Sequence, residues 1–239
     1  MISEDTIKAL IIKYQTTEDN VRREYYQHLF LSYFYQQPKS EDIFFKGGTA
    51  LRILHNSLRF SEDLDFNSAF IDYKGIESLV IDTLSQMKKE NIKFNLKEGN
   101  PTSGGFIGTV SFEEIANPIT IQIEISQREE EKKGEVVAVT SDFIPPYNVI
   151  SVTEQQLVFE KIRALLDRKT PRDFYDLYFI LRKQFPIQHS KKVLPQVLKL
   201  LKESNINFEG ELRQFLPRSQ WAIIRDFKTN LTREISRFI

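Results

Sequence analysis

The sequence contains no cysteine and only three histidines among its 239 residues. The absence of cysteine excludes a disulfide scaffold, thiolate zinc sites and a cysteine nucleophile. The histidines, His28, His55 and His189, lie far apart in the sequence and leave little room for a histidine-based metal site. Sulfur chemistry is therefore excluded, and a zinc site is disfavoured.

The sequence also lacks a long hydrophobic run. No apolar segment approaches the roughly 18–20 residues that a membrane span requires. The N-terminal segment, MISEDTIKAL, is acidic and lacks the basic-then-apolar pattern of a signal peptide. Apolar residues make up 41% of the chain and aromatic residues 12%, which is enough for a buried core and excludes a disordered chain. We therefore expect a soluble, cytoplasmic protein without a membrane partner.

Net charge is absent as well, because 33 basic residues balance 33 acidic ones, which argues against a simple polybasic binder. The balance is uneven along the chain: residues 182–239 carry 12 Lys and Arg against 5 Asp and Glu. We call residues 182–239 the basic C-terminal segment. Such a segment either binds a polyanion or forms a solvated helical surface, and charge alone does not decide between the two.

Hydrophobic periodicity predicts an α+β fold. Helical spacing predicts helices over residues 7–14, 17–35, 49–55 and 72–89. Alternating or β-branched runs predict strands over residues 43–45, 63–66, 92–96, 106–112, 119–126 and 136–139. Turn signals at 100–105 and 117–118 separate the later strands, and the charged run 129–133 is expected to form a hairpin tip or loop.

Capping signals mark the rest of the chain as helical. Thr153 and Gln156 fit a capping box, and Thr170 before Pro171 gives a second helix start. Two or three further helices are expected over residues 191–238. We therefore predict two regions: residues 1–150 form a mixed sheet flanked by helices, and residues 151–239 form a helical bundle.

The most informative segment is FKGGTALRILHNSLRFSEDLDFNS, residues 45–68. It predicts a strand, a Gly-Gly-Thr turn and a helix, followed by an Asp-Leu-Asp sequence on a second strand. Because side chains alternate along a strand, Asp63 and Asp65 are expected on the same face. Two carboxylates on one face form an oxygen-rich site that suits Mg²⁺.

The turn in this segment suits a phosphate group. Gly47 and Gly48 allow a ligand to approach the backbone closely, and the amides of Thr49 and Ala50 at the helix N-terminus suit an anion such as a triphosphate. Phosphoryl transfer needs this combination of metal ions and a backbone cradle. A Gly-Gly turn and an Asp-x-Asp pair are each common by chance, but their coupling on successive elements is far rarer.

These motifs resemble the signature of the AbiEii/AbiGii-type nucleotidyltransferase toxins. The first block is Gly-Gly-Thr-Ala-Leu from Gly47, followed by Arg-Phe-Ser-x-Asp-Leu-Asp-Phe over 59–66. The second block contains Glu154, then Lys-Ile-Arg-Ala-Leu-Leu from Lys161 and Arg-Asp-Phe-Tyr-Asp-Leu over 172–177. The family comprises the toxins of abortive-infection and type IV toxin–antitoxin modules, within the DNA polymerase β-like nucleotidyltransferase superfamily. The resemblance spans roughly residues 40–185.

The resemblance implies roles for individual residues. It implies three metal ligands with catalytic roles, namely Asp63, Asp65 and Glu124. It implies further catalytic roles for Lys161, the family's essential lysine, and for Asp173, its last motif acid. It implies nucleotide contacts for Gly47, Gly48, Thr49, Arg59, Ser61 and Lys161.

Glu124 fills the place of the third carboxylate that the superfamily carries on a later strand. Isoleucines at 119, 121, 123 and 125 form one face of that strand, and Glu124 is the only acid on the other. Many superfamily members have Asp there, so the longer Glu is a departure. The alternative is a solvent-facing glutamate on a half-exposed strand.

Ordinary structural roles compete with the functional ones in the second block. Lys161 borders the apolar side of its helix, and Asp173 at the third helical position is a normal helix-start stabiliser. Asp176 is expected to pair with Arg172 or Lys169. Arg59 and Arg172 either contact phosphate or neutralise the acidic cluster.

The leading functional prediction is a metal-dependent nucleotidyltransferase that uses Mg²⁺ or Mn²⁺. It moves a nucleoside monophosphate from an NTP to an acceptor and releases pyrophosphate. The resemblance points to RNA, notably tRNA 3′ ends, as the acceptor, to a role as a toxin and to an antitoxin encoded nearby. The alternatives are a non-catalytic nucleotide- or RNA-binding protein on the same fold, and a structural protein whose acids serve only folding.

Overall fold

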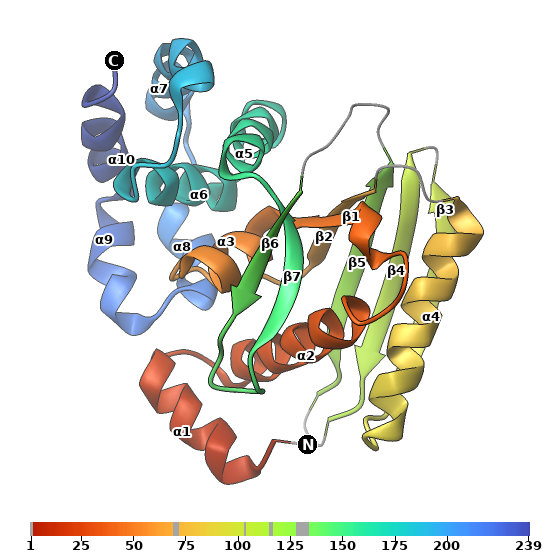
Figure 1. Ribbon diagram of the computed structural model, residues 1–239. Coiled ribbons are helices and arrows are strands. Elements are labelled where there is room, and N and C mark those ends of the chain that lie inside the picture. The colour runs from red at the N-terminus through yellow and green to blue at the C-terminus, as the bar shows by residue number, and fades with distance from the viewer. Residues whose placement is uncertain (1, 69–71, 103, 115–116, 128–133) are drawn as a thin grey trace. The chain divides into compact units, whose positions relative to one another are not determined.

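The computed structural model of the protein describes residues 2–68, 72–102, 104–114, 117–127 and 134–239 (Figure 1). The chain divides into two compact units. The first unit contains the chain up to residue 13 together with residues 17–56 and 60–152, and the second contains residues 14–16, 57–59 and 153–239. A short segment that includes Arg59 therefore belongs to the mostly C-terminal unit.

The first unit is built on a mixed β-sheet. Among the described residues, seven strands occur in the order β3-β4-β5-β2-β1-β7-β6. Their bounds are Ile43–Lys46 (β1), Leu64–Ser68 (β2), Phe94–Thr102 (β3), Gly105–Phe112 (β4), Ile119–Gln127 (β5), Gly134–Val139 (β6) and Tyr147–Val152 (β7). Neighbouring strands run antiparallel except for two parallel pairs, β2 with β5 and β1 with β7.

Two helices of the first unit cover one face of this sheet. Its helices are Glu4–Tyr14 (α1), Glu18–Phe34 (α2), Gly47–His55 (α3) and Tyr73–Lys89 (α4). α2 and α4 pack against each other and contact β5 and β4 respectively (Figure 1). The ring of Phe34 on α2 lies 5.2 Å from that of Phe66 on β2, so the even-numbered apolar side chains of β2 face the helices. Because side chains alternate, Asp65 belongs to the opposite face.

The second unit is helical. Its α-helices are Glu154–Arg168 (α5), Pro171–Arg182 (α6), Leu194–Glu203 (α7), Phe208–Leu212 (α8), Trp221–Arg225 (α9) and Phe227–Ser236 (α10). Its interior is aromatic: the Phe227 ring lies 5.9 Å from Tyr175 and 4.9 Å from Phe208. The predicted fold class, a mixed sheet flanked by helices with a C-terminal helical bundle, is confirmed.

The structure departs from the predicted elements at β7, β3 and α3, among others. β7 was not predicted, because its polar residues Asn148 and Ser151 hide a strand that pairs with both β1 and β6. β3 extends into the predicted turn at 100–105, since Thr102 still pairs with Gly105. α3 begins at Gly47 rather than at residue 49. The charged run predicted as a loop at 129–133 and Ser103 of the turn lie outside the described residues.

Candidate active site

Gly47 joins β1 to α3 and makes room for a carboxylate. Its φ is +83°, a backbone conformation that side chains with a Cβ rarely adopt. A Cβ placed on Gly47 would lie 2.0 Å from Oδ2 of Asp65. The Asp65 carboxylate therefore lies directly against the first turn of α3. Both the backbone angle and this close approach require glycine at position 47.

The N-terminus of α3 presents backbone donors without a side-chain cap. The residue that precedes the helix, Lys46, makes no capping hydrogen bond through its side chain to the described residues. The amides of Gly47, Gly48 and Thr49 lie in the first turn, where N–H groups have no partner within the helix and the helix dipole is positive. Such a terminus binds phosphate groups. The helix therefore starts two residues earlier than expected, and the binding of phosphate by its first amides stays a prediction.

Thr49 ties the start of α3 to the segment before β2. Its side chain is fully buried, and its hydroxyl donates a hydrogen bond to the backbone carbonyl of Asp63. The Thr49 side chain thus positions Asp63, while the backbone amide of Thr49 lies in the first turn of α3. Ser61, a predicted nucleotide contact, is half-buried, and its carbonyl accepts a hydrogen bond of 3.0 Å from Nε2 of Gln27.

A lysine and two carboxylates form a row across three adjacent strands. Lys46 on β1 is the register partner of Asp65 on β2, and Asp65 is the parallel register partner of Glu124 on β5. Residues that face each other across strands project from the same face of a sheet. The row therefore lies on the face opposite α2 and α4. Sequence reasoning missed Lys46, although its place directly before the glycine pair was a usable signal.

Glu124 projects away from the isoleucine face of its strand, as predicted. Its four isoleucine neighbours at 119, 121, 123 and 125 are buried. Glu124 itself is half-buried and accepts a hydrogen bond of 3.2 Å from the Ser126 hydroxyl. A serine donor orients this carboxylate beside Asp65. Glu124 is therefore well placed for the predicted role, which stays a prediction.

The donor set of this row suits a hard divalent cation. Asp63, Asp65 and Glu124 offer carboxylate oxygens. The prediction that Asp63 lies on the strand was wrong, because β2 begins at Leu64 and Asp63 comes directly before it. Among the described residues, no group of three or more His, Asp or Glu side chains is arranged to hold a metal ion. Mg²⁺ usually takes one or two protein carboxylates and completes its shell with water and substrate phosphates. The Asp65–Glu124 pair fits that pattern.

The second unit contains a buried ion cluster centred on Asp176. Nε and Nη2 of Arg59 lie 2.8 and 2.9 Å from the two oxygens of Asp176, and Nζ of Lys161 lies 2.7 Å from one of them. Burial alone would raise the pKa of Asp176, but the positive charges of Arg59 and Lys161 lower the pKa to about 2. Both Arg59 and Lys161 therefore contact the same carboxylate.

The predicted partners of Asp176 were wrong. Arg172 lies 3.6 Å from Glu211, and Lys169 ends α5 in the left-handed conformation. The actual partner Arg59 comes from 117 positions earlier in the chain, a separation that local spacing does not reveal. Asp176 is the residue of this cluster that sequence reasoning undervalued.

Asp173 stabilises the start of α6, which is the structural role that competes with its predicted catalytic role. It forms a capping box with Thr170 at the start of α6. Its second oxygen accepts a hydrogen bond of 2.6 Å from Arg168. These contacts account for its burial in the described structure, and its catalytic role stays a prediction.

Comparison with known proteins places this geometry in a family. Residues 29–236 match the family model described as "Nucleotidyl transferase AbiEii toxin, Type IV TA system". A comparison with curated protein sequences gives no match. No described helix is long and apolar enough to cross a membrane.

Two solved structures share the fold at low sequence identity. MenT4, a nucleotidyltransferase toxin from Mycobacterium tuberculosis H37Rv, has a TM-score of 0.64 and 16% identity, and the match covers 100% of this chain and 90% of that one. JHP933 from Helicobacter pylori has a TM-score of 0.62 and 18% identity, with 93% of each chain covered. At such identities the likeness shows the fold alone.

Proposed function

Since the chain belongs to the AbiEii family of nucleotidyltransferase toxins of type IV toxin–antitoxin systems, we propose that it transfers a nucleoside monophosphate from an NTP to RNA. Family membership makes the chain a nucleotidyltransferase, which confirms the predicted enzyme class over the non-catalytic alternative. The RNA acceptor, the metal dependence and the residue roles are the proposed part. Action on cellular RNA would take place in the cytoplasm.

One observation carries the proposal: the Asp65 carboxylate lies against the uncapped N-terminus of α3, with Glu124 beside it. The amides of Gly47, Gly48 and Thr49 would bind phosphate oxygens of the NTP. Asp65 and Glu124 would hold Mg²⁺ or Mn²⁺, which supplies positive charge to the phosphates when bound. Asp63, the third ligand that the resemblance implies, would join them only once the metal is bound, since the described structure does not group the three. Lys46 would limit the repulsion among these carboxylates.

The reaction then balances as a simple substitution at phosphorus. An acceptor hydroxyl oxygen forms a bond to the α-phosphorus, and the bond from that phosphorus to the oxygen bridging the α and β phosphates breaks. Pyrophosphate leaves with that oxygen, and the hydroxyl proton passes to solvent. Positioning and charge stabilisation by the protein are the main requirements of this chemistry.

The ion cluster of the second unit would contribute positive charge. The Lys161 side chain is 10% exposed, whereas Arg59 and Asp176 are more deeply buried. We propose that Lys161 contacts phosphate oxygens of the nucleotide. Asp176 and Arg59 would act as positioning residues, because they fix the ammonium group of Lys161 in one place.

The basic C-terminal segment supports an RNA acceptor. Several of its cations already serve the fold: Arg182 and Arg237 pair with Glu234, and Nζ of Lys228 donates to two backbone carbonyls. By contrast, the exposed side chains of Lys183, Lys191 and Lys192 form no ion pair with the described residues. These three lysines are the proposed RNA contacts.

The test is transfer of α-³²P from each of the four NTPs to tRNA and total RNA. We expect label at RNA 3′ ends with Mg²⁺ or Mn²⁺ and none with EDTA. Expression without an antitoxin should slow bacterial growth, and Asp63→Ala should relieve it. Absence of labelled RNA with every NTP, despite a folded protein, would contradict the proposed acceptor.

A further inference from the structure

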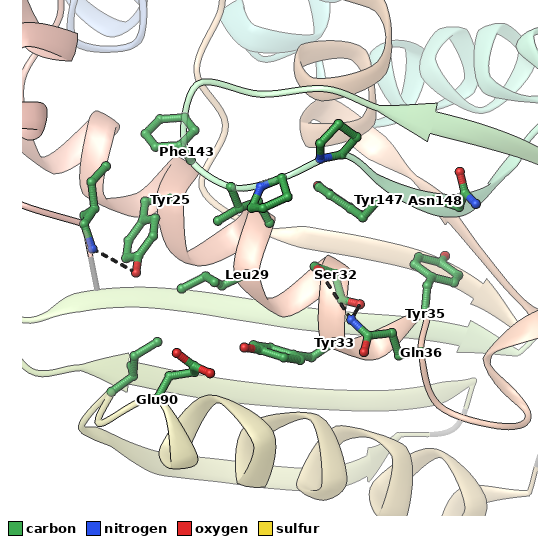
Figure 2. Close-up of a pocket in the computed structure, with 15 residues that line it drawn as sticks. Tyr25, Leu29, Ser32, Tyr33, Tyr35, Gln36, Glu90, Phe143, Tyr147 and Asn148 are labelled. Atoms are coloured by element: carbon green, nitrogen blue, oxygen red, sulfur yellow. Dashed lines mark hydrogen bonds between the residues drawn. The ribbon is translucent and has the colours of Figure 1, made fainter.

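A recess lies on the face of the first unit's sheet that α2 and α4 cover. It is a cavity of about 690 Å³, a volume in the range of ligand sites. One side of α2, the end of α4 and the segment 143–148 between β6 and β7 line it (Figure 2). Because the carboxylate row projects from the opposite face, an occupant of this cavity would leave that row accessible.

Aromatic rings form much of the wall. Tyr25, Tyr33, Phe143 and Tyr147 line the cavity, and Figure 2 shows their rings around its interior. The position of the Tyr147 ring is fixed by a hydrogen bond of 2.8 Å between its hydroxyl and Nδ1 of His28. Such rings offer electron-rich faces that attract organic cations.

The segment 143–148 contributes a rigid, exposed shelf. Its sequence contains the exposed pair Pro145 and Pro146, and proline fixes its own backbone angle. The hydroxyl of Ser141 accepts hydrogen bonds of 3.3 Å from the amides of Phe143 and Ile144, which holds the entry to the shelf. Extended, proline-rich peptides dock in grooves lined by aromatic side chains, and the rings of this cavity form such a lining beside the shelf.

The charge of the cavity is negative. Among its described lining residues, Glu90 is the one charged side chain. The carboxylate of Glu90 and the hydroxyl of Tyr33 lie at the same end of the cavity (Figure 2). α2 ends at Phe34 and α4 at Lys89, so two helix C-termini add partial negative charge. A phosphate-bearing ligand would be repelled here, whereas a lysine or arginine side chain would be attracted.

We propose that this cavity binds an extended peptide segment of a partner protein, with a lysine or arginine side chain directed at Glu90. The peptide backbone lies along the shelf of Pro145 and Pro146, and the amide side chains of Gln36 and Asn148 at the rim offer hydrogen bonds to it. Charge complementarity selects the basic side chain, and the aromatic wall packs against its methylene groups.

The test uses three blocked tripeptides as probes, Pro-Arg-Pro, Pro-norleucine-Pro and Pro-Glu-Pro, each titrated into the full chain. Backbone amide signals are followed by NMR. We expect Pro-Arg-Pro to shift the signals of Gln36, Phe143 and Asn148 in a saturable way, while Pro-Glu-Pro leaves them unchanged. Glu90→Gln should weaken Pro-Arg-Pro binding about two- to fivefold, the range for an exposed ion pair.

Charge reversal keeps the proposal falsifiable. Glu90→Lys should reverse the preference, so that Pro-Glu-Pro binds better than Pro-Arg-Pro. Glu98→Gln, which removes an exposed carboxylate on the edge strand β3, should change neither peptide's affinity. Equal binding of all three peptides, shifts confined to other residues, or no saturable shift by Pro-Arg-Pro would each overturn the proposal. These readouts do not depend on nucleotidyl transfer.

Discussion

The two units treat charge in opposite ways. In the first unit, two half-buried carboxylates, Asp65 and Glu124, lie side by side with Lys46 as the neighbouring cation. In the second unit, Asp176 is 1% exposed and held by both Arg59 and Lys161. Like charges that adjoin at an open face need a cation or ligand, whereas opposite charges in the interior already satisfy each other.

The difference separates function from stability. Removing a carboxylate from the row relieves the repulsion between Asp65 and Glu124, so we expect its main effect on activity. Removing Asp176 leaves two buried cations without their counter-ion, so its effect should appear in the free energy of unfolding. Each prediction below tests one side of this contrast.

The largest expected effect is on activity. Asp65→Asn keeps the size of the side chain but removes its charge, and we expect transfer to RNA to fall about a thousandfold, since charge stabilisation of this kind is worth several kcal/mol. The melting temperature should stay unchanged or rise. Asp82→Asn, at an exposed carboxylate on α4, is the matched control and should keep full activity. Full activity in Asp65→Asn would break the assignment of the row.

The next largest effect is on stability. Asp176→Ala should lower the free energy of unfolding by about 3–5 kcal/mol, the cost of breaking a buried ion cluster. Urea titration followed by the fluorescence of Trp221, the only tryptophan, reports this directly in the second unit. Asp173→Ala, which removes the third-position partner of the Thr170 cap and its ion pair with the exposed Arg168, should cost less, about 1 kcal/mol. If both variants lower the free energy of unfolding by the same amount, the ion cluster stabilises the unit no more than a helix-start contact does, which would contradict this prediction.

The pH dependence should also differ between the units. Burial lowers the pKa of His28 in the first unit to about 3, while an unfolded histidine has a pKa near 6.5. The unfolded state therefore binds the extra proton between these values, and stability falls as pH drops below about 6.5. The pKa of Asp176 is lowered from 3.8 to about 2, so its contribution is lost only below about pH 3.8.

Hydrogen exchange of the α2 and α6 amides between pH 7 and 4.5 measures this difference. Protection in α2 should decline across that range, and protection in α6 should persist. His28→Gln should flatten the decline, whereas His189→Gln, at an exposed histidine, should not. Parallel decline of both helices in the His28→Gln variant would contradict the assignment to His28.

A smaller effect is expected at the glycine turn. Gly47→Ala imposes strain from the positive φ, about 1–3 kcal/mol, and also displaces the Asp65 carboxylate. In a variant that already carries Asp65→Gly, the same change should cost less, because only the backbone strain remains. A double-mutant cycle from urea denaturation measures the coupling. Additive costs would mean that the two residues do not compete for space.

The smallest effect is expected from the exposed lysines. Changing Lys183, Lys191 and Lys192 together to Gln should weaken RNA binding and reduce the slope of log K against log salt by about two units. Affinity for NTP should stay the same. Filter binding at several salt concentrations measures both the RNA affinity and its salt dependence, and the same assay with labelled NTP measures the NTP affinity. An unchanged slope would show that these lysines are only a solvated surface.

The sequence predicted those features of the two units that depend only on neighbouring residues, namely strand faces and helix starts. The alternation of isoleucines around Glu124 gave the correct face of β5, and alternation placed Asp65 opposite Leu64 and Phe66 on β2, because strand periodicity depends on neighbours alone. Asp63, expected on the same strand, lies before it. The capping signals of Thr153 and Thr170 marked the starts of α5 and α6 correctly. The family resemblance then supplied the enzyme class.

The parts that depend on distant residues could not be predicted. The contacts of Asp176 with Arg59 and of Asp65 with Gly47 exist only once separate segments come together. Lys46 gained its place beside Asp65 through strand register, which the sequence does not state. β7 was missed although Tyr147, Val149, Ile150 and Val152 favour a strand, because Asn148 and Ser151 interrupt the run and its pairing with β1 and β6 is non-local.

The central claim is that the row beside α3 is the metal and nucleotide site, and Mn²⁺ tests it most directly. Mn²⁺ broadens the NMR signals of nearby nuclei, so the metal's position can be read without any assay of activity. With Mn²⁺ and NTP added, we predict that the amide signals of Gly47, Asp65 and Glu124 broaden first, and that the double variant Asp65→Asn with Glu124→Gln retains them. Preferential broadening elsewhere, or equal broadening in the double variant, would contradict the account.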